Sequence, residues 1–307
     1  MKVWIALLFA ILNIYLTSAQ TYDTLIGDSA HQVRSQVHNL NGTQFIYPKP
    51  TVFTFLKNIP KTFAHGAKES FHKKSLPAWG IIAGSTAVLV LVDQSLSDKT
   101  QQFSRFIGLD YSRRYINLIQ FKLGNQPVNV YQAPDNFNTA LYSAGEGWPA
   151  VLISIGMLTH GAIKNDYRSL STASQIMQAN ITVGITTQIL KRITGRESPF
   201  AASQPGGKWS PVTALSTYQK SVSHYDAFPS GHMTTMMSTI TVLALNYPEK
   251  KWIRPIGYAI MTIVGFSMVN NGVHWMSDYP LAIGIGYVVG KVTVKMNRVV
   301  KESDKRK

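Results

Sequence analysis

Six apolar stretches divide the sequence between residues 77 and 294, and they limit the folds that the chain can adopt. Each is long enough for a helix, but none is a continuous run of about twenty apolar residues. No segment keeps the two-residue alternation of a half-buried strand for long. We therefore predict an all-α fold, a bundle of about six core helices embedded in a membrane. The stretches are Pro77–Val92, Trp148–Ile163, Ser174–Leu190, Gly231–Leu245, Pro255–Val269 and Tyr279–Val294.

The composition agrees with short, partly polar helices that pack on each other. Charged residues make up only 15% of the chain, which favours membrane contact, whereas a mean hydropathy of -0.00 is low for a chain of lipid-exposed helices. The third stretch carries Gln175, Gln178 and Asn180. Such a helix is expected to face protein or water and not lipid. Between the first two stretches, Phe103–Phe121 has an amphipathic pattern and Asn125–Asn138 resembles a loop.

Four segments are expected along the chain. Residues 1–19 resemble a secretory signal peptide, with Lys2, an apolar run and cleavage after Ala19, although an uncleaved anchor is the alternative. Residues 20–75 form an N-terminal extension, irregular as far as Pro50. Its later part interleaves lysines with phenylalanines, which suits either an anionic membrane surface or a helix packed on the core. Residues 76–296 form the helical domain, and residues 297–307 a basic tail.

Charge indicates the partner and the orientation. The net charge of +15 suits an anionic partner, and no basic tract interleaved with aromatic residues along one face points to nucleic acid. If all six stretches cross a membrane, most lysines and arginines lie on one side, which predicts that this side is cytoplasmic. A cleaved signal peptide would invert that arrangement. We favour the orientation that the charge asymmetry predicts, because it combines the charges of several loops.

Pro229-Ser230-Gly231-His232 stands at the head of the fourth stretch and has the composition of a helix start. Ser230 has the side chain of an N-cap, and Gly231 permits close approach to the backbone. The free N–H groups and the positive dipole end at a helix N-terminus suit a phosphate. His232, in the first turn, is placed to transfer a proton. An ordinary capped helix is the simpler interpretation of these four residues alone.

Two further clusters lie at helix ends that an alternating helix order brings to the same side. One runs from Lys191 to Pro199 and the other from Ser267 to Asp278. The basic residues of the first also suit a membrane interface or a helix C-terminus. His274 and Asp278 are spaced as a helix pair, but a carboxylate on one imidazole nitrogen also leaves the other nitrogen as a nucleophile.

Together the three clusters resemble the signature of the type-2 phosphatidic acid phosphatase and vanadium haloperoxidase superfamily, KxxxxxxRP, PSGH and SRxxxxxHxxxD. The resemblance covers about residues 77–294 and implies a helical bundle with six spans in the membrane branch. It implies that His274 is a nucleophile forming a phosphohistidine, that Asp278 orients it, and that His232 is the general acid. It also implies that Lys191, Ser230 and Gly231 bind phosphate oxygens, with no cofactor and no metal.

The chain departs from this signature at two arginines that bind the phosphate. Ser198 replaces the arginine before Pro199, and Met268 replaces the arginine after Ser267. A charge-assisted hydrogen bond contributes about 1.5–3 kcal/mol, so losing two corresponds to about 10² to 10⁴ in rate. We expect Arg196 to supply a replacement guanidinium, with Asn270 and Asn271 as neutral donors.

The leading hypothesis is therefore a metal-independent phosphatase that acts on a phosphomonoester or pyrophosphate of a membrane lipid. We expect it in a bacterial cell envelope, in the inner membrane, with the active site facing the periplasm. The alternatives are a catalytically impaired lipid-phosphate binding protein, a soluble periplasmic acid phosphatase and a vanadate-dependent haloperoxidase. Its partners would be a phosphorylated lipid or other phosphoester and the membrane, and not nucleic acid.

Overall fold

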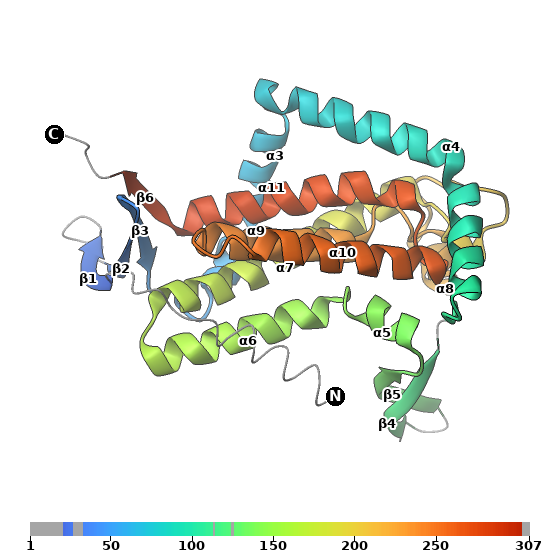
Figure 1. The fold of residues 1–307 in the computed structure, drawn as a ribbon, viewed down its shortest axis with the longest axis horizontal. Coiled ribbons are helices and arrows are strands. Elements are labelled where there is room, and N and C mark those ends of the chain that lie inside the picture. The colour runs from blue at the N-terminus through green and yellow to red at the C-terminus, as the bar shows by residue number, and fades with distance from the viewer. Residues whose placement is uncertain (1–20, 27–32, 113, 124–125, 303–307) are drawn as a thin grey trace.

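The computed structural model of the protein describes residues 21–302 except residues 27–32, 113, 124 and 125. The predicted signal peptide lies outside the described residues. The described part is a bundle of long helices with a small sheet at one end and a β-hairpin near the other (Figure 1). The helical class predicted from the six apolar stretches is confirmed, and strands are added to it at the periphery.

Each predicted apolar stretch forms a helix, and four of the six helices start and end within three residues of the expected bounds. The third begins seven residues before Ser174, and the first continues well beyond Val92. The helices are α4 (Leu76–Phe106), α6 (Gly147–Lys164), α7 (Tyr167–Thr194), α9 (Gly231–Asn246), α10 (Ile253–Asn270) and α11 (Tyr279–Asn297).

Helix α9 lies at the centre of the bundle, packed against α11, α7, α10 and α6. Two apolar clusters surround it, one centred on Met233 and Val264 and the other on Val183 and Val242. The contact with α11 is close because α11 presents glycines. A Cβ atom at Gly286 would lie 2.5 Å from the carbonyl oxygen of Thr234 on α9, so a larger residue there would push the two helices apart.

The polar helix α7 is buried in protein, as its composition predicts. Gln178 donates to the hydroxyl of Thr62 at 2.7 Å, and Gln175 accepts from Asn246 at 2.6 Å. These amides are almost fully buried, so their hydrogen bonds offset the cost of removing them from water. The hydrogen bonds link α7 to α9 and to the N-terminal helix α3 (Ile59–Ser70).

Two segments of the described chain are helical, long and apolar enough to cross a membrane, Lys73–Phe106 and Ile253–Asn270. They correspond to α4, with the short turn η1 (Lys73–Ser75) before it, and to α10. No residue of the apolar window in α4 is buried against protein, which distinguishes α4 from the central helices. Figure 1 shows α4 running along the outside of the bundle and then turning down beside the end that carries the hairpin.

The segment before Pro50 was predicted to be irregular, and this expectation is wrong for its described part. An antiparallel sheet has the order β1 (Thr21–Ile26), β2 (Val33–Leu40), β3 (Thr43–Pro48), β6 (Val299–Glu302). The β2–β3 turn is Asn41-Gly42 with positive φ angles at both residues, which is the geometry of a tight hairpin. Because β6 comes from the far end of the chain, part of the predicted basic tail completes the sheet.

The segment after α4 also differs from expectation. Strands β4 (Tyr115–Leu123) and β5 (Gln126–Pro134) form a hairpin where an amphipathic segment and a loop were predicted. The hairpin projects beyond the bundle (Figure 1). It leads into helix α5 (Phe137–Ser143), whose N-terminus is capped by Asn136 through the N–H of Thr139 at 2.7 Å. This return places α5 against α10.

The basic segment before α4 forms α2 (Thr54–Lys57) and α3, which packs on α11 and α7. Thr62 and Gly66 of α3 are buried in this contact, whereas Phe53 and Phe71 on either side of α3 are largely exposed. The packing of α3 on α11 and α7 agrees with one of the two predicted uses of the segment, a helix packed on the core.

Candidate active site

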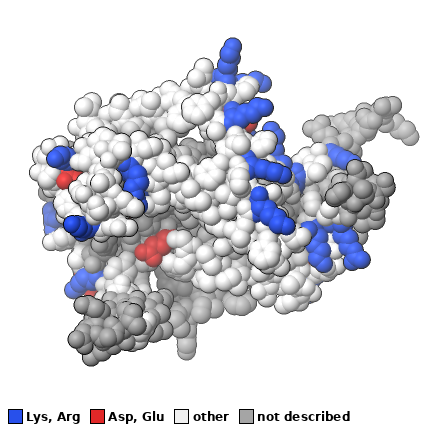
Figure 2. Space-filling model, turned by 180° about the vertical axis from the view of Figure 1, so that it is seen from behind, with Lys and Arg blue, Asp and Glu red and all other residues white. Residues whose placement is uncertain are grey.

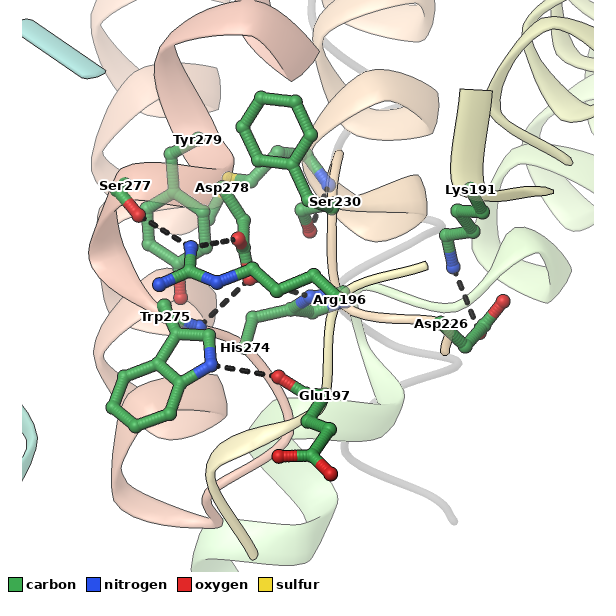
Figure 3. Close-up of polar contacts among 12 residues, drawn as sticks. Lys191, Arg196, Glu197, Asp226, Ser230, His274, Trp275, Ser277, Asp278 and Tyr279 are labelled. Carbon is green, nitrogen blue, oxygen red and sulfur yellow. Dashed lines mark hydrogen bonds and ion pairs between the residues drawn. The ribbon is translucent and has the colours of Figure 1, made fainter. Parts of the chain in front are cut away.

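The three sequence clusters meet at one end of the bundle (Figure 3). The C-terminus of α7 brings Lys191 there, the N-terminus of α9 brings Ser230, and the connection from α10 to α11 brings His274. That connection contains the short helix η4 (Met276–Asp278). A long loop joins the first two clusters and holds the remaining short helices, η2 (Pro199–Ala201), α8 (Leu215–Lys220) and η3 (Val222–His224).

Local backbone chemistry sets where these helices stop and start. Helix α7 ends at Gly195, which has a φ of 56° and donates its N–H to the carbonyl of Lys191 at 2.8 Å. A Cβ there would lie 1.9 Å from the carbonyl oxygen of Ser210, so only glycine fits. Ser230 caps α9 by accepting from the N–H of Met233, as the sequence predicts. The backbone N–H of Ser230 donates to the carbonyl of Asp278. This second hydrogen bond holds the start of α9 against the connection that carries His274.

The two histidines are neighbours. Their ring centroids are 5.6 Å apart with nearly perpendicular planes, and the Tyr142 ring of α5 lies 4.8 Å from the ring of His232 on its other side. His274 is almost fully buried, whereas His232 is half-buried. The two imidazoles are therefore close enough to act on one bound group from two directions.

Asp278 holds His274 in place. Its Oδ2 lies 3.3 Å from Nδ1 of His274 and accepts the backbone N–H of Trp275 at 2.8 Å. With Nδ1 directed at a carboxylate, the imidazole presents Nε2 as its reactive nitrogen. This is the arrangement that the four-residue spacing of His274 and Asp278 suggested.

Lys191 is buried next to Gly231, with its Nζ 3.9 Å from where a Cβ of that glycine would lie. The Nζ forms an ion pair with Asp226 at 2.8 Å (Figure 3). Asp226 also accepts the hydroxyl of Tyr218, and burial together with this carboxylate raises the pKa of Tyr218 to about 12. Lys191 thus lies beside the N-terminus of α9, where the sequence placed a phosphate-binding cation.

Arg196 does not lie where we expected it. Its side chain is fully buried, and its two terminal nitrogens are taken up by protein oxygens. Nη1 donates to Ser277 at 2.6 Å and to Asp278 at 2.7 Å. Nη2 donates to Asp93 at 2.7 Å and to the carbonyl of Gly206 at 2.8 Å. The predicted replacement for a phosphate-binding arginine is therefore corrected: this guanidinium binds two carboxylates behind the histidine.

Ser198 and Met268, which stand at the positions of the two signature arginines, lie in different surroundings. Met268 is fully buried and packs in the apolar cluster that includes Met233 and Val264, so its side chain belongs to the core. Ser198 is buried at the start of η2. The amides offered as neutral donors, Asn270 and Asn271, line a cavity of about 360 Å³ together with Gln101, Tyr111, Ser112, Phe200 and Gly272.

Glu197 organises the loop beyond Arg196. Its carboxylate accepts the backbone N–H groups of Ser203 at 2.8 Å and Lys208 at 2.9 Å, and faces Nδ1 of His224 at 3.3 Å. Burial alone would raise the pKa of Glu197, but these hydrogen bonds lower it below its ordinary value. The loop is thereby folded back over Arg196.

Sequence reasoning missed Asp93 and Ser277 as parts of this network, and Asp226 as the partner of Lys191. Only Asp93 carried a usable signal, because it is a carboxylate directly after an apolar stretch. Its partner is 103 residues away, and nothing in the pattern of α4 identifies it.

Residues 173–301 match the family model of the PAP2 superfamily. The match starts in α7, whereas the resemblance noted from the sequence begins near residue 77. A stretch of 68 residues is 31% identical to a lipid A 1-phosphatase of Porphyromonas gingivalis, covering 22% of this chain and 15% of that protein.

Two solved structures resemble the chain. One is the LpxE of Aquifex aeolicus, 19% identical with a TM-score of 0.36, covering 52% of this chain and 84% of the other. The second is a transmembrane PAP2 type phosphatidylglycerolphosphate phosphatase from Bacillus subtilis, 14% identical with a TM-score of 0.34, covering 80% of this chain and 96% of the other.

Proposed function

We propose that this protein is a phosphatase that removes phosphate from a phosphomonoester or pyrophosphate of a membrane lipid, through a phosphohistidine on His274. The observation that carries the proposal is the pair of neighbouring histidines, one of them held by Asp278. The match of residues 173–301 to the family model of the PAP2 superfamily supports it. The matched part of a lipid A 1-phosphatase puts lipid A phosphates first among the substrates to be tested.

In the proposed reaction, Nε2 of His274 attacks phosphorus while the bond from phosphorus to the lipid oxygen breaks. His232 donates a proton to that oxygen, and the lipid alcohol leaves. Water then attacks the phosphohistidine as His232 accepts its proton, and the P–N bond breaks to release phosphate. The Lys191 ammonium and the N-terminus of α9 at Ser230 and Gly231 bind the phosphate oxygens. These steps use only side chains and backbone groups of this chain, and we propose no cofactor.

The Lys191–Asp226 ion pair fits this role, because a cation with a carboxylate partner stays in place while no substrate is bound. An incoming phosphate offers the same ammonium a second anion beside the helix N-terminus. Asp226 is only partly buried, so it has access to solvent when the phosphate displaces it. This exchange gives the buried lysine an anionic partner in both states.

We further propose that the catalytic end faces the periplasm of a bacterial cell envelope. On the face shown in Figure 2, a run of Lys and Arg side chains lies over the half of the molecule nearer the sheet, and further Lys and Arg side chains lie at the opposite end. Exposed lysines at the sheet end include Lys57, Lys61, Lys251 and Lys295. The catalytic histidines lie at the other end, so the positive-inside rule leaves them on the side away from the cytoplasm.

The experiment is phosphate release from purified protein in detergent, measured on a lipid A 1-phosphate, a phosphatidate, an isoprenyl pyrophosphate and p-nitrophenyl phosphate. His274→Ala is the inactive reference, and Lys49→Ala, in the sheet region of the molecule, is the control. We expect turnover on at least one lipid and none with His274→Ala. Acid-labile and base-stable ³²P on the wild type in a single turnover would identify the phosphohistidine. Equal release by wild type and His274→Ala on every substrate would refute the proposal.

A lipid-phosphate binding protein without turnover is the second candidate, and the burial of Met268 favours it. The family arginine has been replaced by a core side chain, and Arg196 does not substitute for it. This candidate predicts that wild type and His274→Ala bind vesicles containing a lipid phosphate equally well, with no ³²P label on either protein.

A further inference from the structure

Asp93 is a buried carboxylate in α4, a helix whose apolar window is not buried against protein. Its exposed fraction is 1%, and Ser97 and Ser104 on the same helix are also buried. Burying an unpaired carboxylate costs several kcal/mol, so such a residue is retained only where a partner neutralises it.

The partner is Arg196. Oδ2 of Asp93 accepts Nη2 of Arg196 at 2.7 Å, and Oδ1 accepts the backbone N–H of Ser277 at 3.1 Å. The hydroxyl of Ser277 contacts both Asp93 and Arg196. Asp93 therefore ties helix α4 to the short helix η4 directly before α11, at the point where α4 reaches the catalytic end.

The same guanidinium fixes Asp278. Nη1 of Arg196 binds Oδ1 of Asp278 at 2.7 Å, which leaves Oδ2 for His274 and for the N–H of Trp275 (Figure 3). Each carboxylate oxygen thus has a different task, and the plane of the Asp278 carboxylate is set by Arg196. Arg196 in turn is held on its other nitrogen by Asp93 and the Gly206 carbonyl.

We propose that Asp93 is a positioning residue for the reaction at His274, acting through Arg196 and Asp278. This rests on the proposed function, in which His274 is the nucleophile. Asp93 itself touches neither histidine. Its carboxylate holds the guanidinium in the one orientation that aligns Asp278 with Nδ1 of His274, so helix α4 takes part in ordering the nucleophile.

The test is Asp93→Asn, which keeps the shape and removes the charge. We expect kcat to fall about 10- to 100-fold with KM within twofold of wild type, because the nucleophile is misaligned while the phosphate-binding groups stay in place. Asp98→Asn on the same helix is the matched control, since Asp98 is exposed and accepts a hydrogen bond from Gln94 of the same helix. It should leave both constants unchanged. Wild-type kcat in Asp93→Asn, or a loss of kcat with an equal rise in KM, would overturn the proposal.

Ser277→Ala covers the case in which Asp93→Asn does not fold. It removes a hydroxyl that contacts both Asp93 and Arg196 but leaves both charges, and we expect kcat to fall about threefold to tenfold at unchanged KM. A wild-type kcat in this variant would count against the proposal.

A second readout is independent of turnover. With ¹⁵N-labelled histidine, the Nδ1 proton of His274 bonded to Asp278 should give a downfield resonance that is absent from His274→Ala. We expect it in wild type and Asp98→Asn, and shifted or lost in Asp93→Asn. If wild type has no activity on any substrate, the proposed function fails, and this resonance alone decides whether Asp93 positions His274. An unchanged resonance in Asp93→Asn would overturn that role.

Discussion

The two ends of the bundle each contain a buried arginine bound to a carboxylate, and the comparison shows how one interaction serves two purposes. At the end with the candidate active site, Arg196 binds Asp93 and Asp278, and all three side chains are fully buried. At the other end, Arg168 binds Glu249 at 2.7 Å and the backbone carbonyl of Asn246, and the Glu249 side chain retains 19% exposure.

The difference lies in what each carboxylate holds next. Asp278 continues to His274, so Arg196 orders a side chain that we propose as nucleophile. Glu249 lies in the turn after α9, and the Asn246 carbonyl is at the end of that helix, so Arg168 closes a helix terminus. The Arg168 guanidinium also stacks on Tyr247, 4.0 Å from the ring centroid. A buried ion pair is therefore informative about function only when its partners are followed outward.

The largest expected effect comes from removing each arginine. Arg196→Met leaves two buried carboxylates without a cation, and we expect the free energy of unfolding to fall by about 3–5 kcal/mol. Arg168→Met leaves one carboxylate that reaches solvent, so a loss of about 1–3 kcal/mol is expected. Urea unfolding in detergent, followed by tryptophan fluorescence, measures both. Equal losses of unfolding free energy in the two variants would show that the burial of the carboxylate partner does not decide the cost of removing the arginine.

Neutralising the carboxylate partners should separate the two ends by activity. Asp278→Asn removes the charge that holds His274, and we expect kcat to fall about 10²- to 10⁴-fold. Glu249→Gln, its counterpart at the other end, should leave kcat within twofold and lower the free energy of unfolding by about 1 kcal/mol. Steady-state phosphate release and urea unfolding on the same preparations test this pair. A kcat loss in Glu249→Gln comparable to that in Asp278→Asn would remove the functional distinction.

The smallest effect concerns pH and sharpens the description of the catalytic end. The pKa of Glu197 lies below its ordinary value of 4.5, so its hydrogen bonds stabilise the loop above that pH, and this stability is lost as pH falls through the lowered pKa. Hydrogen exchange at the Ser203 and Lys208 amides, relative to amides in α9, should therefore increase below about pH 4. Glu197→Gln should abolish this pH dependence. Protection that does not change with acid would disprove the role of the carboxylate.

Much of the helical framework was predictable because helices are local. The apolar stretches that became α6, α7, α9, α10 and α11 carry their own starts and stops, such as Ser230 at the head of α9 and Gly195 at the end of α7. The strands were harder. The Asn41-Gly42 turn is a local signal of a hairpin, whereas the pairing of β3 with β6 joins opposite ends of the chain. The β4–β5 hairpin has only a short alternation of polar and apolar residues as its local signal.

The sequence by itself determined which residues stand at the helix ends of the candidate site: Lys191, Ser230, Gly231, His232, His274 and Asp278. Those positions follow from spacing along single helices and from the order of the helices. Only the tertiary structure decided that Arg196 binds Asp278 and Asp93, that Met268 lies in the core, and that Ser277 joins the same network. Such contacts depend on which of several oxygens a cation meets after the helices pack, and residues 103 positions apart leave no periodic trace of that choice.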